Sequence, residues 1–337
     1  SGFSPGYLIN EILTRMGRNT FLILSLLIPI MAGMGLNFGM TLGAMAGQIG
    51  LIFAADWQIW GIPGMVLAVI ISIPISVLLG LFCGKMLNMA KGREMITSYI
   101  IAFFMNGLYQ LVVLYMMGPV IPIKHASIKL PRGYGIRNTV SLLNMRQALD
   151  NLWAIRIGGV KIPVLTLLIT GLLCLFIIWF RKTKLGQDMR AVGQDMDVAR
   201  DAGIKVERTR IIAIVLSTVC AGIGMVIYLQ NMGNIATYSS HTQIGMFCIA
   251  ALLVGGASVD KASIGNAFLG VVLFHLMFIV APSAGAKITG DSMIGEYFRV
   301  FVSYGVITLA LIMYETKKRI AKGKAGEQLK LDQSEEE

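Results

Sequence analysis

The chain has 337 residues, of which 55% are hydrophobic and 14% are charged, and its mean hydropathy is +0.72. A soluble protein carries about 25% charged residues, so a water-soluble globular fold is excluded and a membrane protein is expected. The net charge of +11 would suit nucleic acid, but Lys and Arg also gather in cytoplasmic loops of membrane proteins, and we expect no nucleic-acid partner.

Eight apolar stretches approach the roughly 20 residues that cross a bilayer. They predict an all-α polytopic protein with about 8 full transmembrane helices. The stretches are 20–36, 62–84, 95–117, 162–180, 211–229, 240–258, 262–281 and 297–314. The predicted parts are an N-terminal segment 1–19, a transmembrane domain 20–314 and a charged tail 315–337.

Basic residues next to the spans predict the orientation. Arg15 and Arg18 precede the first span, Lys91 and Arg93 follow the second, and five Lys or Arg residues follow the last. The positive-inside rule assigns these residues, and with them both termini, to the cytoplasm. The loop 118–161 is then external and the loop 181–210 is cytoplasmic.

The segment 37–55 does not fit this orientation as a simple span, because it would begin and end outside. Glycines recur in it every three or four residues, with Asn37 and Gln48 among them. We therefore predict a broken or re-entrant segment near 37–55, whose backbone groups are buried in protein or line a cavity. A glycine, loop and apolar-helix layout at 54–70 recurs at 252–273 and indicates a possible inverted repeat.

Several kinds of chemistry are missing from the sequence. All 18 acidic residues lie outside the apolar spans or at their edges, which disfavours a proton-coupled transporter. No Walker A motif, nucleophile elbow or HExxH motif is present. Neither His125, His241 and His275 nor the four cysteines have metal-ligand spacing, and no metal site is predicted. The cysteines (Cys83, Cys174, Cys220 and Cys248) lie in apolar runs and are expected to pack as small hydrophobic residues.

The stretch 181–210 holds eight basic and five acidic residues between two uncharged runs. Asp195 predicts the start of a short helix and Gly203 its end. A narrow apolar stripe is predicted at Met189, Val192, Met196 and Ala199. Two interpretations are open: an amphipathic loop on the membrane surface, or a helix that docks on a cytoplasmic partner.

This stretch resembles the cytoplasmic loop of ABC importer permeases of the ribose, nucleoside and branched-chain amino acid type. The matching pattern is Thr183-x2-Gly186-x3-Arg190-Ala191-x-Gly193-x5-Ala199-x3-Gly203-Ile204. The runs "AIVLSTVCAGIGMVIYLQ" and "LLVGGAS" also resemble the family, and the resemblance covers roughly residues 20–315. It implies that the loop carries the helix that couples the permease to an ATPase. The implied coupling residues are Gly186, Arg190, Ala191, Gly193, Asp195, Met196, Ala199 and Gly203.

The resemblance also implies partners in a bacterial cell membrane. These are one or more ABC ATPase subunits that bind ATP and Mg²⁺, a second permease chain, identical or paralogous, and an extracytoplasmic substrate-binding protein. This chain itself would bind no cofactor and would not be an enzyme. The external loop 118–161 is unusually basic, and its arginines are candidates for docking the binding protein. They are Arg132, Arg137, Arg146 and Arg156. A loop in water or on lipid headgroups and an anionic substrate are the alternatives.

Polar residues in the apolar segments are candidates for a translocation cavity. They are Asn37, Thr41, Gln48, Asn106, Tyr109 and Gln110. Asn106, Tyr109 and Gln110 share one helical face by their spacing. Asn37-Phe38-Gly39 resembles the nucleoside-type pattern, but Thr41 stands where those relatives have Glu, so the substrate class stays open. A secondary transporter or facilitator is the second hypothesis, and a membrane enzyme or scaffold is the third.

Overall fold

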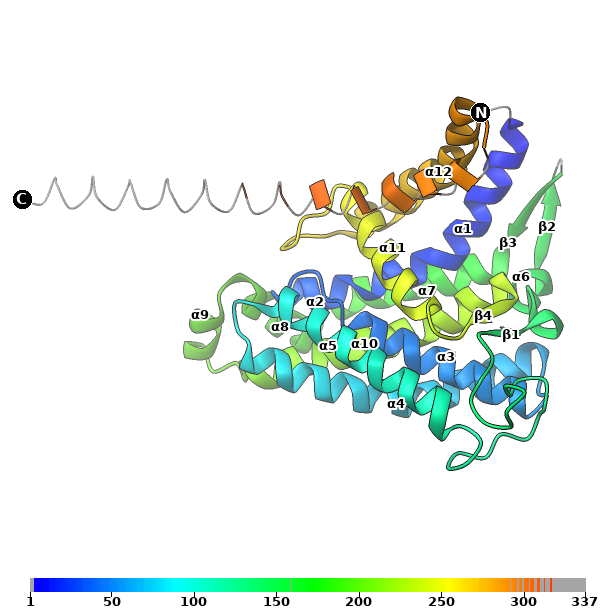
Figure 1. The fold of residues 1–337 in the computed structure, drawn as a ribbon. Helices are drawn as coiled ribbons and strands as arrows, with labels where there is room; N and C mark the ends of the chain where they lie inside the picture. The colour runs from blue at the N-terminus through cyan, green and yellow to red at the C-terminus, as the bar shows by residue number, and fades with distance from the viewer. Residues whose placement is uncertain are drawn as a thin grey trace, which may run out of the picture. The chain divides into compact units, whose positions relative to one another are not determined.

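The computed structural model describes residues 3–157 and 159–291 and, beyond them, scattered positions between 293 and 316. The chain divides into two compact units, residues 2–276 and residues 277–337. The first unit is a bundle of helices and contains every candidate site residue (Figure 1). Helix α12 (Ile264–Thr289) begins in the first unit and continues into the second, where Gly285 approaches Gly295 closely.

Helices make up most of the first unit. The longer ones are α1 (Pro5–Ser25), α3 (Met40–Asp56), α4 (Gly61–Met89), α5 (Glu94–Leu111), α7 (Val164–Phe180), α10 (Val206–Met232) and α11 (Ser240–Val254). The shorter ones are α2 (Leu27–Met31), α6 (Ala148–Leu152), α8 (Lys184–Gln194) and α9 (Met196–Asp201). A π-helical turn, Val112–Met116, extends α5, and a 3-10 turn covers Leu143–Met145.

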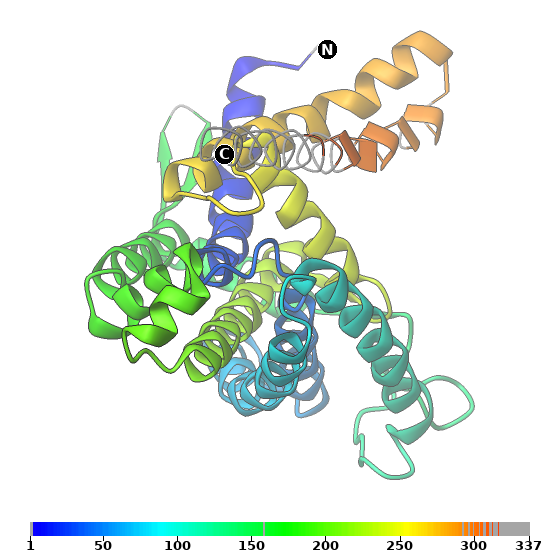
Figure 2. The ribbon, with the colours of Figure 1, turned by 90° about the vertical axis from the view of Figure 1, so that its left-hand side faces the viewer.

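Helices α3, α4 and α10 form the core of the bundle, and Figure 2 shows them side by side. Glycines on α3 bring the helix backbones together. A Cβ atom on Gly43 would lie 2.1 Å from the Thr218 carbonyl oxygen of α10, and one on Gly50 would lie 2.2 Å from the Ala68 carbonyl oxygen of α4. Membrane helices lack a hydrophobic force between them, so this close approach of small residues is what holds them together.

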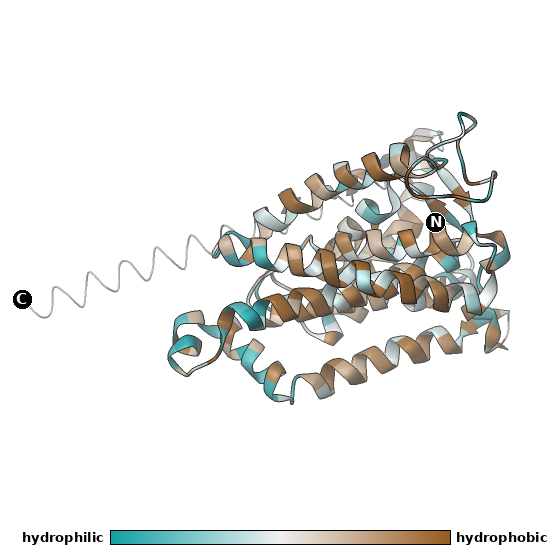
Figure 3. Ribbon diagram, turned by 90° about the horizontal axis from the view of Figure 1, so that it is seen from below, coloured by the Kyte–Doolittle hydropathy of each residue, from teal (hydrophilic) through white to brown (hydrophobic). Residues whose placement is uncertain are grey.

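Hydrophilic residues lie at both ends of the bundle, and Figure 3 shows those of α8 and α9 on its left. The residues 181–210 lie at one end, where the Lys91 ammonium, just past α4, pairs with Glu207 at 2.7 Å. The segment 118–161 lies at the other, where Asp56 at the end of α3 accepts 2.8 Å hydrogen bonds from the backbone N–H groups of Lys124 and His125. We call these the α8–α9 end and the strand end.

The prediction of a broken or re-entrant segment at 37–55 is wrong for residues 40–56. Helix α3 is continuous over Met40–Asp56 and runs from the α8–α9 end to the strand end. The irregular backbone lies earlier, at residues 32–39, where Gly33 and Gly35 have φ angles of +72° and +65°. The repeated glycines of α3 therefore serve close packing against α4 and α10 and do not interrupt the helix.

The predicted positions of segments 1–19 and 118–161 cannot both be right, because the structure places them at the same end. The Lys161 backbone N–H donates to Asn10 Oδ1 at 2.9 Å, and the Arg18 guanidinium donates to Asn231 Oδ1 at 3.1 Å near the end of α10. The Arg18 guanidinium also lies 5.3 Å from the Tyr228 ring centre. The Arg18 guanidinium is thus held against protein groups, so it is a poor guide to membrane orientation.

The predicted number of about 8 full spans is not confirmed. Among the described residues, four helices are long and apolar enough to cross a membrane, and α7 with α8, bent by 75°, makes a possible fifth. The four are Gly61–Met89, Glu94–Met116, Val206–Met232 and Ile264–Ile288. Helices α3 and α11 are apolar but shorter, at 17 and 15 residues. The predicted span 297–314 lies partly, and the tail 315–337 almost entirely, outside the described residues.

The predicted span 20–36 is divided at Leu26 between α1 and α2. Pro29 has no N–H, so it cannot donate to the Ser25 carbonyl four residues earlier. The Ser217 hydroxyl of α10 donates to that carbonyl instead, at 2.8 Å. The break is thus satisfied by a neighbouring helix, as membrane helices require.

Two small antiparallel sheets correct the all-α prediction. β1 (Thr139–Ser141) pairs with β4 (Asn234–Ala236), and β2 (Ala154–Ile157) pairs with β3 (Val160–Pro163). The strands are short, and the first pair joins residues almost a hundred positions apart, so the sequence offered little signal for it. This pair fastens the 118–161 segment to the end of α10.

The inverted repeat stays a prediction. The α3–α4 turn lies at the strand end, whereas the loop before α12 lies near Arg181 and Arg190 at the α8–α9 end. Both hairpins pack through glycine, since a Cβ on Gly270 would lie 2.0 Å from the Ala251 carbonyl oxygen.

Replacing Gly43 by Ala should destabilise the fold. The intrinsic helix propensity of Ala is better than that of Gly by about 1 kcal/mol, but this gain is outweighed. The new methyl group must displace the Thr218 backbone, and overpacking of this kind costs about 1–3 kcal/mol. Thermal unfolding in detergent measures the effect. Gly171→Ala on α7 is the matched control, because nothing lies within 4 Å of its Cβ position. Equal melting temperatures for the two variants would contradict the packing role of Gly43.

Candidate functional site

The α8–α9 hairpin is built from local capping signals. The Thr183 hydroxyl accepts a hydrogen bond from the Gly186 N–H at 3.2 Å and starts α8. Asp195 ends α8 and starts α9, and its carboxylate accepts hydrogen bonds from the N–H groups of Asp197 (2.8 Å) and Val198 (3.0 Å). Gly203 follows α9 with a φ angle of +82°. The predicted helix start at Asp195 is confirmed, and Gly203 ends the helical turn as predicted.

The apolar stripe of the hairpin faces inward, which differs from the expected docking face. Ala199 is 3% exposed and clusters with Val192 and Val206, while Met196 is only partly buried against them. The exposed apolar side chain of α9 is Val198, at 65%. Val198 is surrounded by charge, since Asp197 pairs with Arg200 at 3.0 Å. Sequence reasoning missed Val198 because only the tertiary contact decides which face of a six-residue helix is covered.

Gly193 brings the hairpin against the bundle. A Cβ atom on Gly193 would lie 2.4 Å from the Met31 carbonyl oxygen, and one on Gly33 would lie 2.7 Å from the Gly193 Cα. The last turn of α8 therefore touches the end of α2 backbone to backbone. Gly193 lies within α8, and the separation between α8 and α9 falls at Asp195. Close contact without flexible side chains transmits displacement from one segment to the other.

A buried ion pair makes a second connection at the same end. The Arg210 guanidinium of α10 is 1% exposed and contacts the Glu94 carboxylate of α5 at 2.5 Å. It also lies 2.9 Å from the Met196 sulfur of α9. The ion pair joins α10 to α5, and the sulfur contact adds α9. Separating the pair would leave a buried charge without a partner, which is costly.

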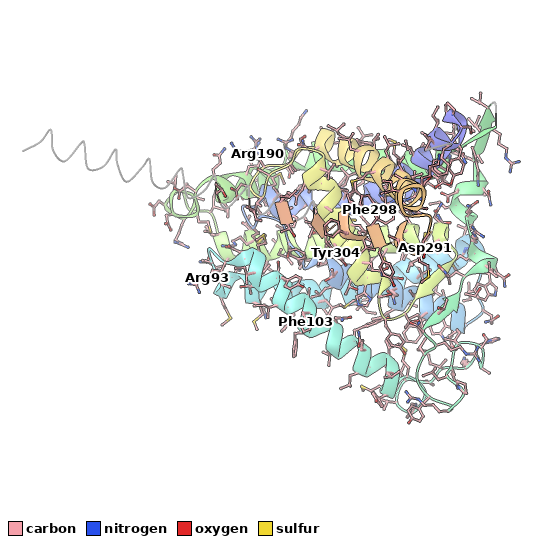
Figure 4. The ribbon with its side chains drawn as sticks, turned by 45° about the horizontal axis from the view of Figure 1, so that its top comes forward. Arg93, Phe103, Arg190, Asp291, Phe298 and Tyr304 are labelled. Carbon is pink, nitrogen blue, oxygen red and sulfur yellow. The ribbon has the colours of Figure 1, made fainter. Side chains whose placement is uncertain are left out.

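The other predicted coupling residues lie around these contacts. Gly186 is buried, and a Cβ there would lie 2.0 Å from the Phe180 carbonyl oxygen. Ala191 is half-buried against Val192, Ala199 and Val206, and Arg190 is exposed. Figure 4 labels Arg190 at the α8–α9 end. The structure thus gathers all eight predicted coupling residues in one hairpin.

A buried polar cluster lies where α3, α5 and α11 meet. The Gln48 amide nitrogen of α3 donates to the Tyr109 hydroxyl of α5 at 2.8 Å and to the Thr237 carbonyl at 2.5 Å. The Tyr109 hydroxyl also donates to the Thr237 carbonyl, at 3.1 Å. His241 of α11 lies 3.2 Å from Gln48 Oε1 and 2.8 Å from Asn106 Oδ1. We call Gln48, Asn106, Tyr109, Thr237 and His241 the polar cluster.

The hydrogen-bond pattern fixes the His241 tautomer. Thr237 offers a carbonyl, which only accepts, so Gln48 must turn its NH₂ toward it and its oxygen toward His241 Nδ1. Nδ1 therefore carries a hydrogen, and in a neutral ring Nε2 accepts. The Asn106 side-chain amide, 2.8 Å from Nε2, is then the donor of this hydrogen bond. Each polar side chain in the cluster has a partner that another helix or loop provides.

The sequence predicted only part of the polar cluster. Gln48, Asn106 and Tyr109 were named, and the structure brings them together. His241 was missed, because its partners lie more than a hundred residues away and its own neighbourhood shows no motif.

Asn37, Thr41 and Gln110 lie outside the cluster. The Asn37 side-chain oxygen Oδ1 accepts from the Gly39 N–H, and the Thr41 hydroxyl donates to the Phe38 backbone carbonyl, both at 2.8 Å. Thr41 also packs against Gly245 of α11. Gln110 is half-buried on α5. These three residues therefore do not share a site with Gln48.

The four candidate docking arginines are exposed at the strand end. Two of them hold the loop itself: the Arg132 guanidinium lies 4.4 Å from the Tyr134 ring centre and donates to the Leu114 carbonyl, and Arg137 donates to the Lys129 carbonyl at 2.8 Å. The aliphatic part of Arg146 packs on Gly233, and Arg156 lies on β2. No group of three His, Cys, Asp or Glu side chains arranged for a metal ion occurs among the described residues.

A nucleoside ABC transporter permease, NupB of Lactococcus lactis subsp. cremoris (strain MG1363), is 26% identical over 94% of the chain and 82% of its own length. The xylose transport system permease XylH of Haemophilus influenzae is 29% identical over 48% of the chain and 40% of its own length. The L-arabinose permease AraH of Escherichia coli (strain K12) is 28% identical over 48% and 47%.

No solved structure matches the chain. One protein family does match, over residues 8–311, and is described as the branched-chain amino acid transport system / permease component. The match includes α8–α9 and the polar cluster. The chain is therefore a multi-pass membrane protein and belongs to the branched-chain amino acid transport system / permease component family.

Proposed function

We propose that the chain is the transmembrane permease subunit of an ATP-driven ABC importer and forms the path of a small polar solute. The observation that carries this proposal is the α8–α9 hairpin. It is a short, doubly capped unit with Val198 exposed between charges, and it touches the bundle through the contact of Gly193 with Gly33. An apolar tip with a charged rim suits a groove on an ATPase subunit.

A movement of the hairpin would reach the polar cluster by two routes. Gly193 presses on residues 31–33, and the following Phe38 N–H donates to the Ser98 hydroxyl of α5 at 3.1 Å. Arg210 also forms an ion pair with Glu94, which is the first residue of α5. Helix α5 carries Asn106 and Tyr109, and the segment 32–39 leads into α3, which carries Gln48. Two of the three helices of the cluster, α3 and α5, are thus mechanically joined to the hairpin.

The proposed orientation places the α8–α9 end in the cytoplasm and the strand end outside, in a bacterial cell membrane. ATP and Mg²⁺ bind on the ATPase chain, and this chain supplies no catalytic residue. A second permease chain, identical or paralogous, completes the path, and an external binding protein delivers the solute. Segment 5–18, which lies at the strand end, is then also external.

A nucleoside or a sugar is the proposed solute. Both carry several hydroxyl groups, and a nucleoside also has ring nitrogens. These groups exchange hydrogen bonds with amide, phenol and imidazole side chains such as those of the polar cluster. A nucleoside is favoured, because the similarity to the nucleoside permease covers 94% of the chain and that to the xylose permease covers 48%.

A secondary transporter or facilitator is the second candidate function. Such proteins commonly use intramembrane acids, whereas the buried acids Asp56 and Asp150 lie at the strand end and are bonded to backbone N–H groups or to Thr166 and Asn231. Purification in mild detergent separates the candidates. Retention of a P-loop ATPase supports the importer, and its consistent absence from active preparations favours the facilitator.

Replacing Val198 by Asp should weaken retention of the ATPase subunit by roughly tenfold, about 1.4 kcal/mol, because the variant puts a charge at the apolar tip. The side chain is exposed, so the permease should fold normally. Ile157→Asp, at an equally exposed apolar position of the strand end, is the control. Ala199→Lys is a poorer test, because Ala199 is buried and the variant would disturb α9 itself. Unchanged retention with Val198→Asp would argue against docking through α9.

Replacing Gln48 by Leu should lower the transport rate at least tenfold, because it removes the bonds from α3 to Tyr109, Thr237 and His241. Leaving buried polar groups unpaired also costs about 1–3 kcal/mol of stability. Solute uptake into vesicles and thermal unfolding are measured together. Ser72→Ala is the control, since the Ser72 hydroxyl bonds only to its own helix at Val69. If uptake falls only in proportion to the folded fraction, the cluster is structural.

Replacing Arg146 and Arg156 by Glu should raise the concentration of binding protein that gives half-maximal transport, by roughly tenfold at low salt. The difference from the wild type should shrink as salt is added, because exposed charges are screened. Lys85→Glu, exposed near the other end, is the control. Arg132 and Arg137 are left in place because they hold the loop. Equal curves at every salt concentration would rule out docking through these arginines.

A further inference from the structure

A pocket of about 330 Å³ opens at the α8–α9 end beside the contact of α8 with α2. Its walls come from α2, the end of α7, the last part of α8 and residues 260–264. Met31 and Gly193 both line it, so any occupant touches the joint between the hairpin and the bundle.

The pocket has an apolar floor and a basic rim. The floor includes Leu27, Ile30 and Ile177, which belong to apolar helices. The rim carries the side chains of Arg181 and Lys261 and, from α8, Arg190, against the single acid Asp260. Arg181 and Arg190 are in no ion pair with another described residue. The rim therefore has a net charge of +2 to offer an anionic ligand.

Its position is at the boundary between hydrocarbon and water. Residues 162–180 carry no charged side chain, and Arg181 is the first cation after them. Trp179, in the last turn of α7, is 61% exposed, and Leu175 one turn earlier is 62% exposed. Exposed Trp beside an apolar helix surface marks the headgroup level of a bilayer.

We propose that this pocket binds the headgroup of an anionic phospholipid. The phosphate lies among Arg181, Arg190 and Lys261, and the first carbons of an acyl chain lie on the floor. The volume is at the small end for ligand pockets, so it admits a headgroup while the chains continue along the exposed surface of α7. Free inorganic phosphate would use the rim but would leave the apolar floor empty.

Binding there would stabilise one arrangement of α8 against α2. The lipid would contact both Met31 and Gly193, beside the backbone contact that joins the hairpin to residues 31–33. The site is independent of the solute and of the direction of transport, so a failed transport assay would leave it standing.

Lipid binding tests the proposal with the intact, purified complex stripped of endogenous lipid. Phosphatidylglycerol and phosphatidylcholine are titrated while bound lipid is counted by native mass spectrometry. We expect the complex to bind phosphatidylglycerol at least tenfold more tightly than phosphatidylcholine. Arg181→Gln combined with Lys261→Gln should remove this preference. Lys182→Gln, an exposed neighbouring cation that does not line the pocket, should keep it.

Three results would overturn the assignment. Equal affinity for the two lipids, or an unchanged preference in the double variant, would show that the basic rim does not hold a lipid phosphate. Displacement of the lipid by millimolar inorganic phosphate would identify a site for soluble anions. Absence of bound lipid in the intact complex, with binding restored when the ATPase is removed, would show that the ATPase covers the pocket.

Discussion

The contact on which the structure depends is the backbone approach of α3 to α10 and α4. Gly43 faces a carbonyl oxygen of α10 and Gly50 one of α4, and neither position has room for a methyl group. In lipid, where apolar side chains gain little by leaving their surroundings, dispersion contacts between closely packed backbones are the available cohesive force. The three-helix core provides a fixed frame, against which α5, α11 and the α8–α9 hairpin are held by fewer and more specific bonds.

The bundle therefore has two parts: the close-packed core of α3, α4 and α10, and the elements that hydrogen bonds and ion pairs attach to it. The Arg210 to Glu94 pair, the Phe38 to Ser98 bond and the polar cluster all fasten α5, at successive levels along its length. The outer face of α5 is apolar and open, with Phe103 74% exposed (Figure 4). The helix next to the proposed path is therefore held mainly by hydrogen bonds and charge.

How much of this followed from the sequence depended on the range of each interaction. The start and end of α9 were predictable, because Asp195 and Gly203 act on residues within one or two turns. The alignment of Asn106 with Tyr109 followed from helical spacing. The role of the α3 glycines was not predictable, since the same spacing suits a broken helix and a close-packed one. His241 and the inward turn of Ala199 depend on residues brought in by the fold, and no local pattern encodes them.

The hydrogen bonds that hold α5 would restrict which solutes can move past this helix. A helix held by dispersion contacts can slide gradually. Hydrogen bonds in a buried interior are either made or absent, and a donor left without an acceptor there costs free energy. The links from Gln48 and His241 to α5 can therefore open only when other donors and acceptors take their places. A solute with matching hydroxyl and ring-nitrogen groups makes that exchange at little cost, and an apolar molecule of equal size does not. Chemical selection would then arise from the exchange of partners within the protein, without a preformed cavity of complementary shape.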